Sequence, residues 1–133
     1  MKTKDKIKSI LIANRGEIAI RIAKTAQKMG IKAVGVKTKK EPLAYYLTHM
    51  DVILDFPERE KDIIPEFLDI ESLVLLAKRN KIDAIHPGYG YLSENAEFAI
   101  RCTEEGILFI GPSPRVIQNL SLIHISEPTR LDV

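Results

Sequence analysis

Short apolar runs alternate along this chain with segments in which apolar residues recur every three or four positions. The ranges 7–13, 31–36, 52–56, 82–85 and 107–110 are predicted strands. The first contains the continuous apolar run 10–13, which is typical of a parallel strand buried on both faces. Helical spacing lies between them, over 17–29, weakly over 43–49, from Asp69 and from Ser93, with a last short helix from Pro114. This alternation predicts an α/β fold: a Rossmann-like parallel sheet of about five strands with helices on both faces.

The first predicted helix is amphipathic, and both of its ends can be recognised. The stripe that we expect to be buried consists of Ile18, Ile22, Ala26 and Met29. Asn14 is a plausible cap, and Gly30 ends the helix. Asp69 is the expected cap of the helix that begins there. Cys102 lies in the apolar pattern of the helix predicted from Ser93, so we expect it to be buried.

Two loops of unusual composition follow the first and fourth predicted strands. These loops are Asn14–Glu17 and His86–Asn95. With the usual strand order 3-2-1-4-5, strands one and four are neighbours, and the winding direction reverses between them. Both loops then open side by side at the carboxyl edge of the sheet, where open α/β sheets hold their ligands. We therefore treat the two loops as one candidate site.

The first loop carries a candidate crevice made by Asn14, Arg15, Gly16 and Glu17. Gly16 is its only glycine, so the loop is not a dinucleotide fingerprint, and the chain has no GxxxxGK[ST] phosphate loop. The free amides of the helix start, helped by Arg15, would suit an anion. A local ion pair between Arg15 and Glu17 is an equally good interpretation.

The second loop combines turn residues with reactive groups. We expect a neutral, buried and hydrogen-bonded imidazole at His86, and candidate ligand-facing positions at Gly88, Tyr89, Gly90 and Glu94. The alternative interpretation is a tight turn with a helix cap at Ser93, where the carboxylate of Glu94 is favoured by the helix dipole alone. No nucleophile–base pair and no metal-ligand spacing can be assembled here. The residues alone predict a ligand-facing crevice without defined chemistry.

Composition narrows the class of protein further. The chain has 133 residues, 45% of them hydrophobic and 29% charged, with a net charge of +2 and a single cysteine. One domain is expected at this length, and a disulfide within the chain is excluded. The charge balance gives no argument for nucleic acid, no apolar run is long enough for a membrane span, and no signal peptide precedes the first strand. We expect a cytoplasmic protein with no nucleic-acid or membrane partner.

Three segments of the chain resemble the signature segments of biotin carboxylase. They are residues 10–19 (ILIANRGEIA), 85–96 (IHPGYGYLSENA) and 109–112 (FIGP), in the family's order. The resemblance covers roughly 6–119 and implies the N-terminal, pre-ATP-grasp domain of this family. The family includes the biotin carboxylase subunit of acetyl-CoA carboxylase and the matching parts of pyruvate and propionyl-CoA carboxylases.

The resemblance implies a reaction and its participants. Such enzymes use ATP and Mg²⁺ to activate bicarbonate, and they carboxylate biotin held by a carrier protein or domain, which then serves a carboxyltransferase. Carried over position by position, Tyr89 faces the biotin site, and Gly88, Gly90 and Glu94 shape that wall. Arg21 matches a position on the surface of the family's homodimer.

The family's residues for ATP, Mg²⁺ and bicarbonate lie downstream of Asn119, in the ATP-grasp domain. We therefore expect 1–119 to be a truncated domain that contains no catalytic residue, binds none of the cofactors tightly and is inactive alone. Residues 120–133 depart from the family, and 120–130 (LSLIHISEPTR) resembles the in-frame translation of a transposon sequencing adapter, so we expect a non-native tail. The alternative is a natural C-terminus.

Two other functional classes remain open. A related ATP-grasp ligase with a different acceptor would use the same kind of domain, although the Gly-Tyr-Gly segment argues against it. A free-standing Rossmann-like ligand-binding or interaction domain would have no catalysis. The sequence does not identify the final carboxylation substrate or the oligomeric state.

Overall fold

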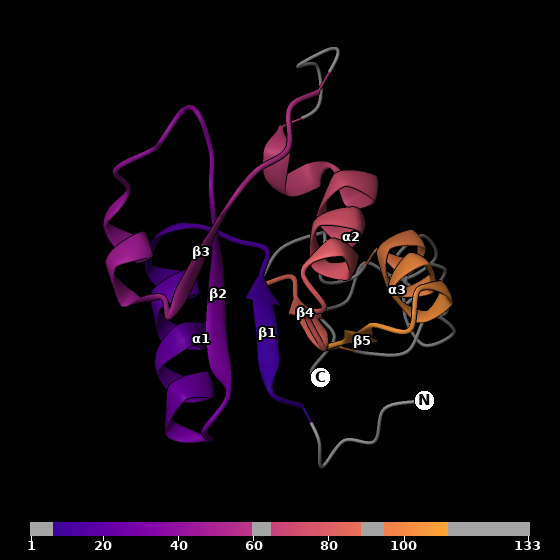
Figure 1. Cartoon of the computed structure of the whole chain (residues 1–133), viewed down its shortest axis with the longest axis horizontal. Coiled ribbons are helices and arrows are strands. Elements are labelled where there is room, and N and C mark those ends of the chain that lie inside the picture. The colour runs from indigo at the N-terminus through magenta and orange to yellow at the C-terminus, as the bar shows by residue number, and fades with distance from the viewer. Residues whose placement is uncertain (1–6, 60–64, 89–94, 112–133) are drawn as a thin grey trace, which may run out of the picture.

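A parallel sheet of five strands, in the order β3-β2-β1-β4-β5, organises the described part of the chain (Figure 1). The computed structural model describes residues 7–59, 65–88 and 95–111. The strands are β1 (Ser9–Ile12), β2 (Lys32–Lys37), β3 (Val52–Asp55), β4 (Ala84–His86) and β5 (Leu108–Phe109). The central strand β1 pairs with β2 and β4, with Leu11 opposite Val34 on one side and Ile85 on the other. The predicted strand order is confirmed.

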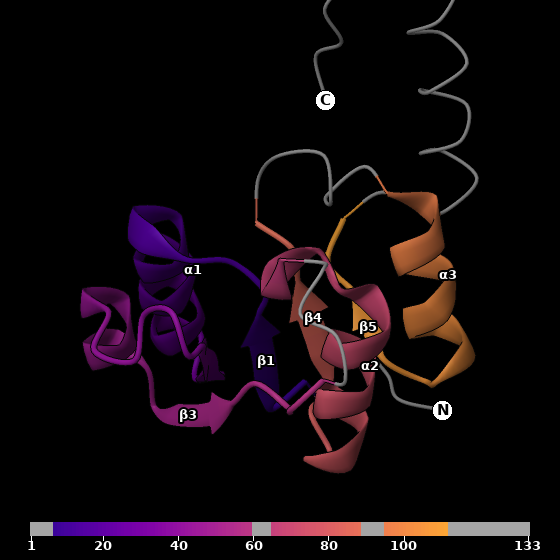
Figure 2. The ribbon, with the colours of Figure 1, turned by 90° about the horizontal axis from the view of Figure 1, so that it is seen from above.

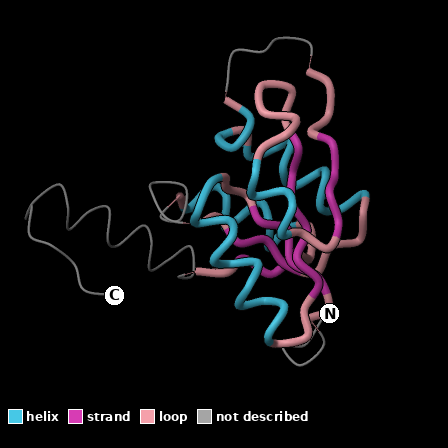
Figure 3. Tube along the Cα trace, turned by 90° about the vertical axis from the view of Figure 1, so that its left-hand side faces the viewer, coloured by secondary structure: helices cyan, strands magenta, loops and turns pink. Residues whose placement is uncertain are grey.

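Helices cover both faces of this sheet, as predicted. They are α1 (Gly16–Lys28), α2 (Ile70–Arg79) and α3 (Ala96–Glu104), with the short 3₁₀ helices η2 (Tyr45–His49) and η3 (Glu66–Leu68). Figure 2 shows α1 on one side of the strands and α2 on the other, with α3 beside α2. Strands and helices alternate along the chain, as the colours in Figure 3 show.

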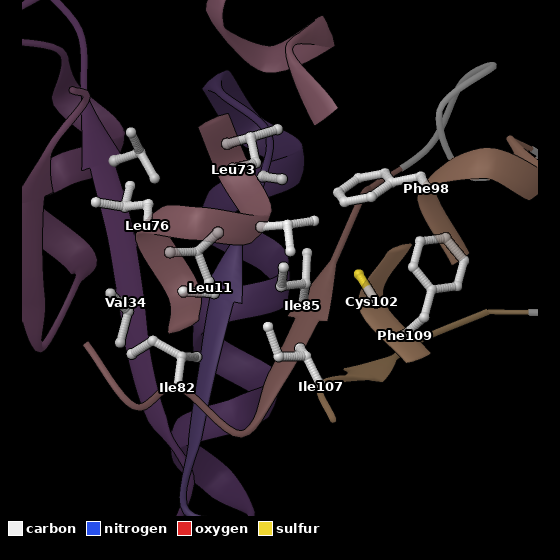
Figure 4. Close-up of a cluster of buried hydrophobic side chains, with 14 of the residues drawn as sticks. Leu11, Val34, Leu73, Leu76, Ile82, Ile85, Phe98, Cys102, Ile107 and Phe109 are labelled. Atoms are coloured by element: carbon white, nitrogen blue, oxygen red, sulfur yellow. The ribbon is translucent and has the colours of Figure 1, made fainter. Parts of the chain in front are cut away.

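The two faces of each strand pack against different helices. Leu11 of β1 belongs to the cluster formed with α2 and α3, whereas Ile12 packs with Ala19 and Ala23 of α1. Figure 4 shows the larger cluster, in which side chains of neighbouring strands meet those of α2 and α3. Because successive strand residues point to opposite faces, the continuous apolar runs of the sequence serve two cores at once.

The α3 side of the larger cluster is built on aromatic packing. The rings of Phe98 and Phe109 lie edge-on with centroids 5.3 Å apart. Cys102 is fully buried beside them, as predicted, and burial raises the pKa of its thiol to about 12. A thiol that stays protonated in this way is a packing group rather than a nucleophile.

The buried side of α1 differs from the predicted stripe. Ala19, Ala23 and Ala26 face the sheet, while Ile18 and Ile22 are only half-buried and Met29 is 68% exposed. The pattern of large apolar residues was misleading because a helix lies closest to a sheet along its smallest side chains. The prediction was right only for Ala26.

The ends of the later helices follow the predicted chemistry in part. Asp69 caps α2, as predicted, accepting a hydrogen bond of 3.1 Å from the backbone N–H of Ser72. α3 begins at Ala96 rather than at Ser93, because Asn95 is the cap and accepts from the N–H of Phe98 at 3.1 Å. Ser93 and the helix predicted from Pro114 lie outside the described residues. The weak helix over 43–49 is the 3₁₀ helix η2.

Candidate functional site

The first and second loops leave the sheet side by side, because β1 and β4 are paired strands. Ile12 lies opposite His86, and the N–H of Ala13 donates to the carbonyl oxygen of His86 at 2.9 Å. This is the last bond of the ladder before both chains turn away from the sheet. The expected meeting of the two loops at the carboxyl edge is confirmed for the residues that the structure describes.

Asn14 bridges the two loops with its side-chain amide. Its Nδ2 donates to the carbonyl oxygen of Pro87 at 3.1 Å, and its Oδ1 accepts from the N–H of Arg15 at 2.7 Å. The cap position of α1 is therefore Arg15, which makes no side-chain cap bond. The prediction of Asn14 as the cap was wrong, because its amide is already bonded to the second loop and to the adjacent N–H.

Gly88 lies directly against Asn14. Its φ is +80°, and a Cβ at this position would be 2.0 Å from Asn14 Nδ2. This is far closer than any van der Waals contact, and positive φ is a conformation that glycine adopts without steric cost. Only glycine fits here without moving its neighbour.

His86 is a neutral, partly buried hydrogen-bond acceptor. The N–H of Gly88 donates to His86 Nδ1 at 3.0 Å, and burial lowers the pKa of the imidazole. A ring nitrogen that accepts a hydrogen bond carries no proton, so the ring proton resides on Nε2. The predicted hydrogen bond is present, and the residue is half-buried rather than buried.

Arg15 pairs with a residue from a different part of the chain. Its guanidinium lies 2.5 Å from the carboxylate of Glu41, and this hydrogen bond raises the pKa of Arg15. The alternative pair with Glu17 is not formed, and Glu17 lies exposed in the first turn of α1. Gly16, with φ of +70°, makes the turn into this helix.

A polar hollow of about 340 Å³ adjoins the Arg15–Glu41 pair. It is lined by Arg15, Thr38, Lys40, Glu41, Pro65, Glu66 and Phe67. Two cations and two carboxylates share this surface, so neither sign of charge dominates. An anion at the start of α1 would therefore meet an arginine whose charge is already balanced.

Arg21, the candidate dimer residue, is exposed on α1. It borders an apolar hollow of about 450 Å³ lined mainly by aliphatic side chains of α1, β1 and the start of β2, with His86 and Ile110 at its end. This hollow lies on the α1 face of the sheet. The hollow and the junction of the two loops share His86.

Three candidate residues, Tyr89, Gly90 and Glu94, lie outside the described residues. Within 7–59, 65–88 and 95–111, no group of three or more His, Cys, Asp or Glu side chains is placed to hold a metal ion. In the same ranges, no helix combines the length and the apolar character that crossing a bilayer requires.

Sequence reasoning missed two residues near the first loop. Glu41 lies in a charged stretch without periodicity, so nothing marked it as the partner of Arg15. Tyr46 is buried, its hydroxyl donates to the carbonyl oxygen of Val36 at 2.8 Å, and burial raises its pKa to about 12. Two adjacent tyrosines in a weakly helical segment gave no signal for which of them is buried.

The fold and the junction of the loops define the class. This is a doubly wound, Rossmann-like domain whose candidate site lies where the winding reverses, between β1 and β4. The family described as "Biotin carboxylase, N-terminal domain" matches residues 6–117. The chain belongs to this family.

Individual relatives agree with the family match. The chain is 51% identical over 106 residues to pyruvate carboxylase of Bacillus subtilis (strain 168), covering 80% of this chain and 9% of the relative. It is 44% identical over 113 residues to biotin carboxylase of Halalkalibacterium halodurans, covering 85% of this chain and 25% of the relative. The crystal structure of the complete multifunctional pyruvate carboxylase from Rhizobium etli aligns with a TM-score of 0.81 at 36% identity, over 95% of this chain and 13% of that one. The chain thus spans a quarter or less of these proteins.

Proposed function

We propose that this chain is the N-terminal domain of an ATP-dependent biotin carboxylase, a carbon–nitrogen ligase that makes carboxybiotin from bicarbonate, ATP and carrier-bound biotin. The family match over 6–117, which includes both loops at the junction of β1 and β4, carries this proposal. Biotin carboxylase and pyruvate carboxylase among its relatives support it. ATP, Mg²⁺ and biotin are the cofactors of the whole enzyme.

The role of this domain is to form one wall of the active site. Tyr89, Gly90 and Glu94 continue from Gly88 and are the positions that would face biotin. In the family, the residues for ATP, Mg²⁺ and bicarbonate lie downstream of Asn119, beyond the segment 6–117 that the family match covers. We therefore assign no step with ATP to this chain, and we expect the isolated chain to be inactive.

The partners follow from the same assignment. They are the ATP-grasp domain, a biotin carboxyl carrier protein or domain, a carboxyltransferase, and a second copy of the enzyme that meets Arg21 of α1. The location that fits these partners is the cytoplasm. We also propose that 120–133 is non-native, and the end of the family match at 117 supports this. Sequencing the source DNA across the codon for Asn119 tests it; the same tail in genomic DNA, followed by a stop, would favour the free-standing binding domain.

A chimeric enzyme tests the function. Residues 6–117 replace the matching N-terminal segment of the Halalkalibacterium halodurans biotin carboxylase, and ATP cleavage is measured with bicarbonate, with and without free biotin. The expected result is biotin-stimulated ATP cleavage by the chimera and none above a blank by the isolated chain. A soluble, folded chimera without this activity, beside an active parent enzyme, would contradict the proposed function.

A further inference from the structure

The two loops of the candidate site are joined by a single side chain. Asn14 is 73 residues away from Pro87 in the sequence, yet its Nδ2 donates to the Pro87 carbonyl oxygen at 3.1 Å. The sheet itself does not need this bond, because the N–H of Ala13 already donates to the carbonyl oxygen of His86 at 2.9 Å. The bond from Asn14 extends the connection one step beyond the ladder, into the second loop.

The chemistry of the amide fixes its orientation. Oδ1 accepts from the N–H of Arg15 at 2.7 Å, while Nδ2 donates to a carbonyl oxygen. Turning the amide over would place an NH₂ group against an N–H and an oxygen against an oxygen, so both bonds would be lost. An aspartate has the same shape but no donor, so it could bond to Arg15 and would oppose the lone pairs of Pro87.

The same side chain also limits where Gly88 can lie. The Asn14 Nδ2, Cγ and Cβ atoms would lie 2.0, 2.7 and 2.9 Å from a Cβ at Gly88. The Gly88 N–H is held from the other side by His86 Nδ1 at 3.0 Å. Pro87 is buried between these contacts and fixes its own φ. The backbone at Pro87 and Gly88 is therefore restrained by the side chains of both Asn14 and His86.

We propose that Asn14 is a positioning residue, whose amide fixes the backbone at Pro87 and Gly88, where the second loop leaves β4. This proposal rests on the proposed function for the identity of the substrate, biotin. It does not depend on that function for the contact itself. Asn14 acts through the backbone of the second loop.

A conservative variant with a matched control tests the contact in the full 133-residue chain. Asn14→Asp removes the donor to Pro87 and keeps the size of the side chain. Asn80→Asp makes the same chemical change at the C-cap of α2, where the Asn80 Nδ2 donates to the Leu76 carbonyl oxygen at 2.8 Å. Each variant loses one partly buried hydrogen bond from a side-chain amide to a backbone carbonyl oxygen. A general loss of stability would therefore appear in both variants.

Amide hydrogen exchange at Gly88 is the first measurement. Loss of a typical hydrogen bond changes a local equilibrium by about 2- to 12-fold. We expect Asn14→Asp to lower the protection of the Gly88 amide by about this factor more than Asn80→Asp does. Equal protection of Gly88 in the two variants would overturn the proposal, whether or not the enzyme assignment is correct.

The chimeric carboxylase provides the second measurement, with the same pair of substitutions. We expect Asn14→Asp to raise the KM for free biotin several-fold and to lower the ratio of biotin-dependent to biotin-independent ATP cleavage, relative to Asn80→Asp. An active chimera in which the two variants have the same KM for biotin would overturn the positioning role and leave the proposed function intact. A chimera inactive without any substitution would contradict the proposed function, and hydrogen exchange would still decide the contact.

Discussion

Replacing Gly88 by alanine is the most direct test of how the two loops fit together. The added Cβ would lie 2.0 Å from Asn14 Nδ2, so the amide must move and its bond to the Pro87 carbonyl oxygen must break. Gly106→Ala is the matched control. Gly106 has φ of +75°, close to the +80° of Gly88, but nothing lies within 4 Å of a Cβ built there.

Gly88→Ala and Gly106→Ala both place an L-residue in the left-handed region, but only Gly88→Ala also causes overpacking. An L-residue in the left-handed region costs about 1–2 kcal/mol, and the lower entropy of the unfolded chain returns about 0.4–1 kcal/mol. Gly106→Ala should therefore lower the free energy of unfolding by about 0–1.5 kcal/mol. Gly88→Ala adds overpacking of about 1–3 kcal/mol and a lost hydrogen bond of about 1 kcal/mol. We expect Gly88→Ala to be the more destabilising by about 2–4 kcal/mol.

Urea denaturation followed by circular dichroism measures this difference, with the free energy extrapolated linearly to water. A double variant localises its cause. Asn14→Ala removes the two nearest atoms, so Gly88→Ala should cost at least about 1 kcal/mol less in that background. Rescue will be partial, because the Cβ of residue 14 would still lie 2.9 Å from the new atom. Equal losses for Gly88→Ala and Gly106→Ala would refute the close approach of Asn14 to Gly88.

Three further variants probe the groups around this junction and the core, all by denaturation of the full chain. Burial lowers the pKa of His86 below 6.5, so the unfolded chain takes up this proton at a higher pH than the folded chain does. The free energy of unfolding should therefore fall as the pH drops below about 6.5. His86→Asn, which keeps an acceptor near Nδ1, should lose less stability over the same range. Asp69→Ala should cost about 1–2 kcal/mol at neutral pH. Partial burial alone would raise the pKa of Asp69, but hydrogen bonds from Ser72 and Arg59 outweigh it and hold the pKa below 3.8, so this contribution should disappear as the pH falls below about 3.8. Phe98→Ala should cost about 3–5 kcal/mol, because the ring is fully buried.

Each of these expectations has an outcome that would contradict it. An unchanged dependence on pH in His86→Asn would show that another group titrates in this range. If Asp69→Ala lowers the free energy of unfolding by the same amount below pH 3.8 as at neutral pH, the stabilisation by the cap does not depend on the charge of Asp69, and the prediction is contradicted. Ile100→Ala, on the exposed side of α3, is the control for Phe98→Ala, and similar losses in the two would place Phe98 outside the core.

The fold could be predicted from the sequence because its signals are local. Most residues of each predicted strand are apolar, and Asp69 caps α2 through Ser72, only three positions away. The buried side of α1 could not be read in the same way. Hydrophobic periodicity gives most weight to Ile18, Ile22 and Met29, whereas close packing on the sheet selects Ala19 and Ala23. The size of the side chains that contact the sheet, which hydrophobic periodicity does not report, decides which residues of α1 are buried.

The position of the candidate site could be predicted from the sequence, whereas the contacts of its residues could not. The strand order places both loops at one edge, and predicting this required the alternation of strands and helices together with the usual strand order of such sheets. The partner of Arg15 could not be predicted, since Glu41 is 26 positions away in a segment without periodicity. The role of Asn14 could not be predicted either, because a helix cap and a bridge to Pro87 demand the same polar side chain at the same position. Only the distance between the two loops distinguishes them.

The junction between β1 and β4 is held by uncharged groups, and this bears on what the domain contributes. The contacts described there are made by the Asn14 amide, the ring of His86 and uncharged backbone groups. Salt screens exposed charges but acts little on such bonds, whereas the exposed pair of Arg15 and Glu41 lies at the periphery, where screening is effective. The junction should therefore keep its geometry across ionic strengths that disrupt charge pairing. This agrees with the proposed function, in which the domain supplies shape to the active site and the rest of the enzyme supplies the charges that act on phosphate and metal.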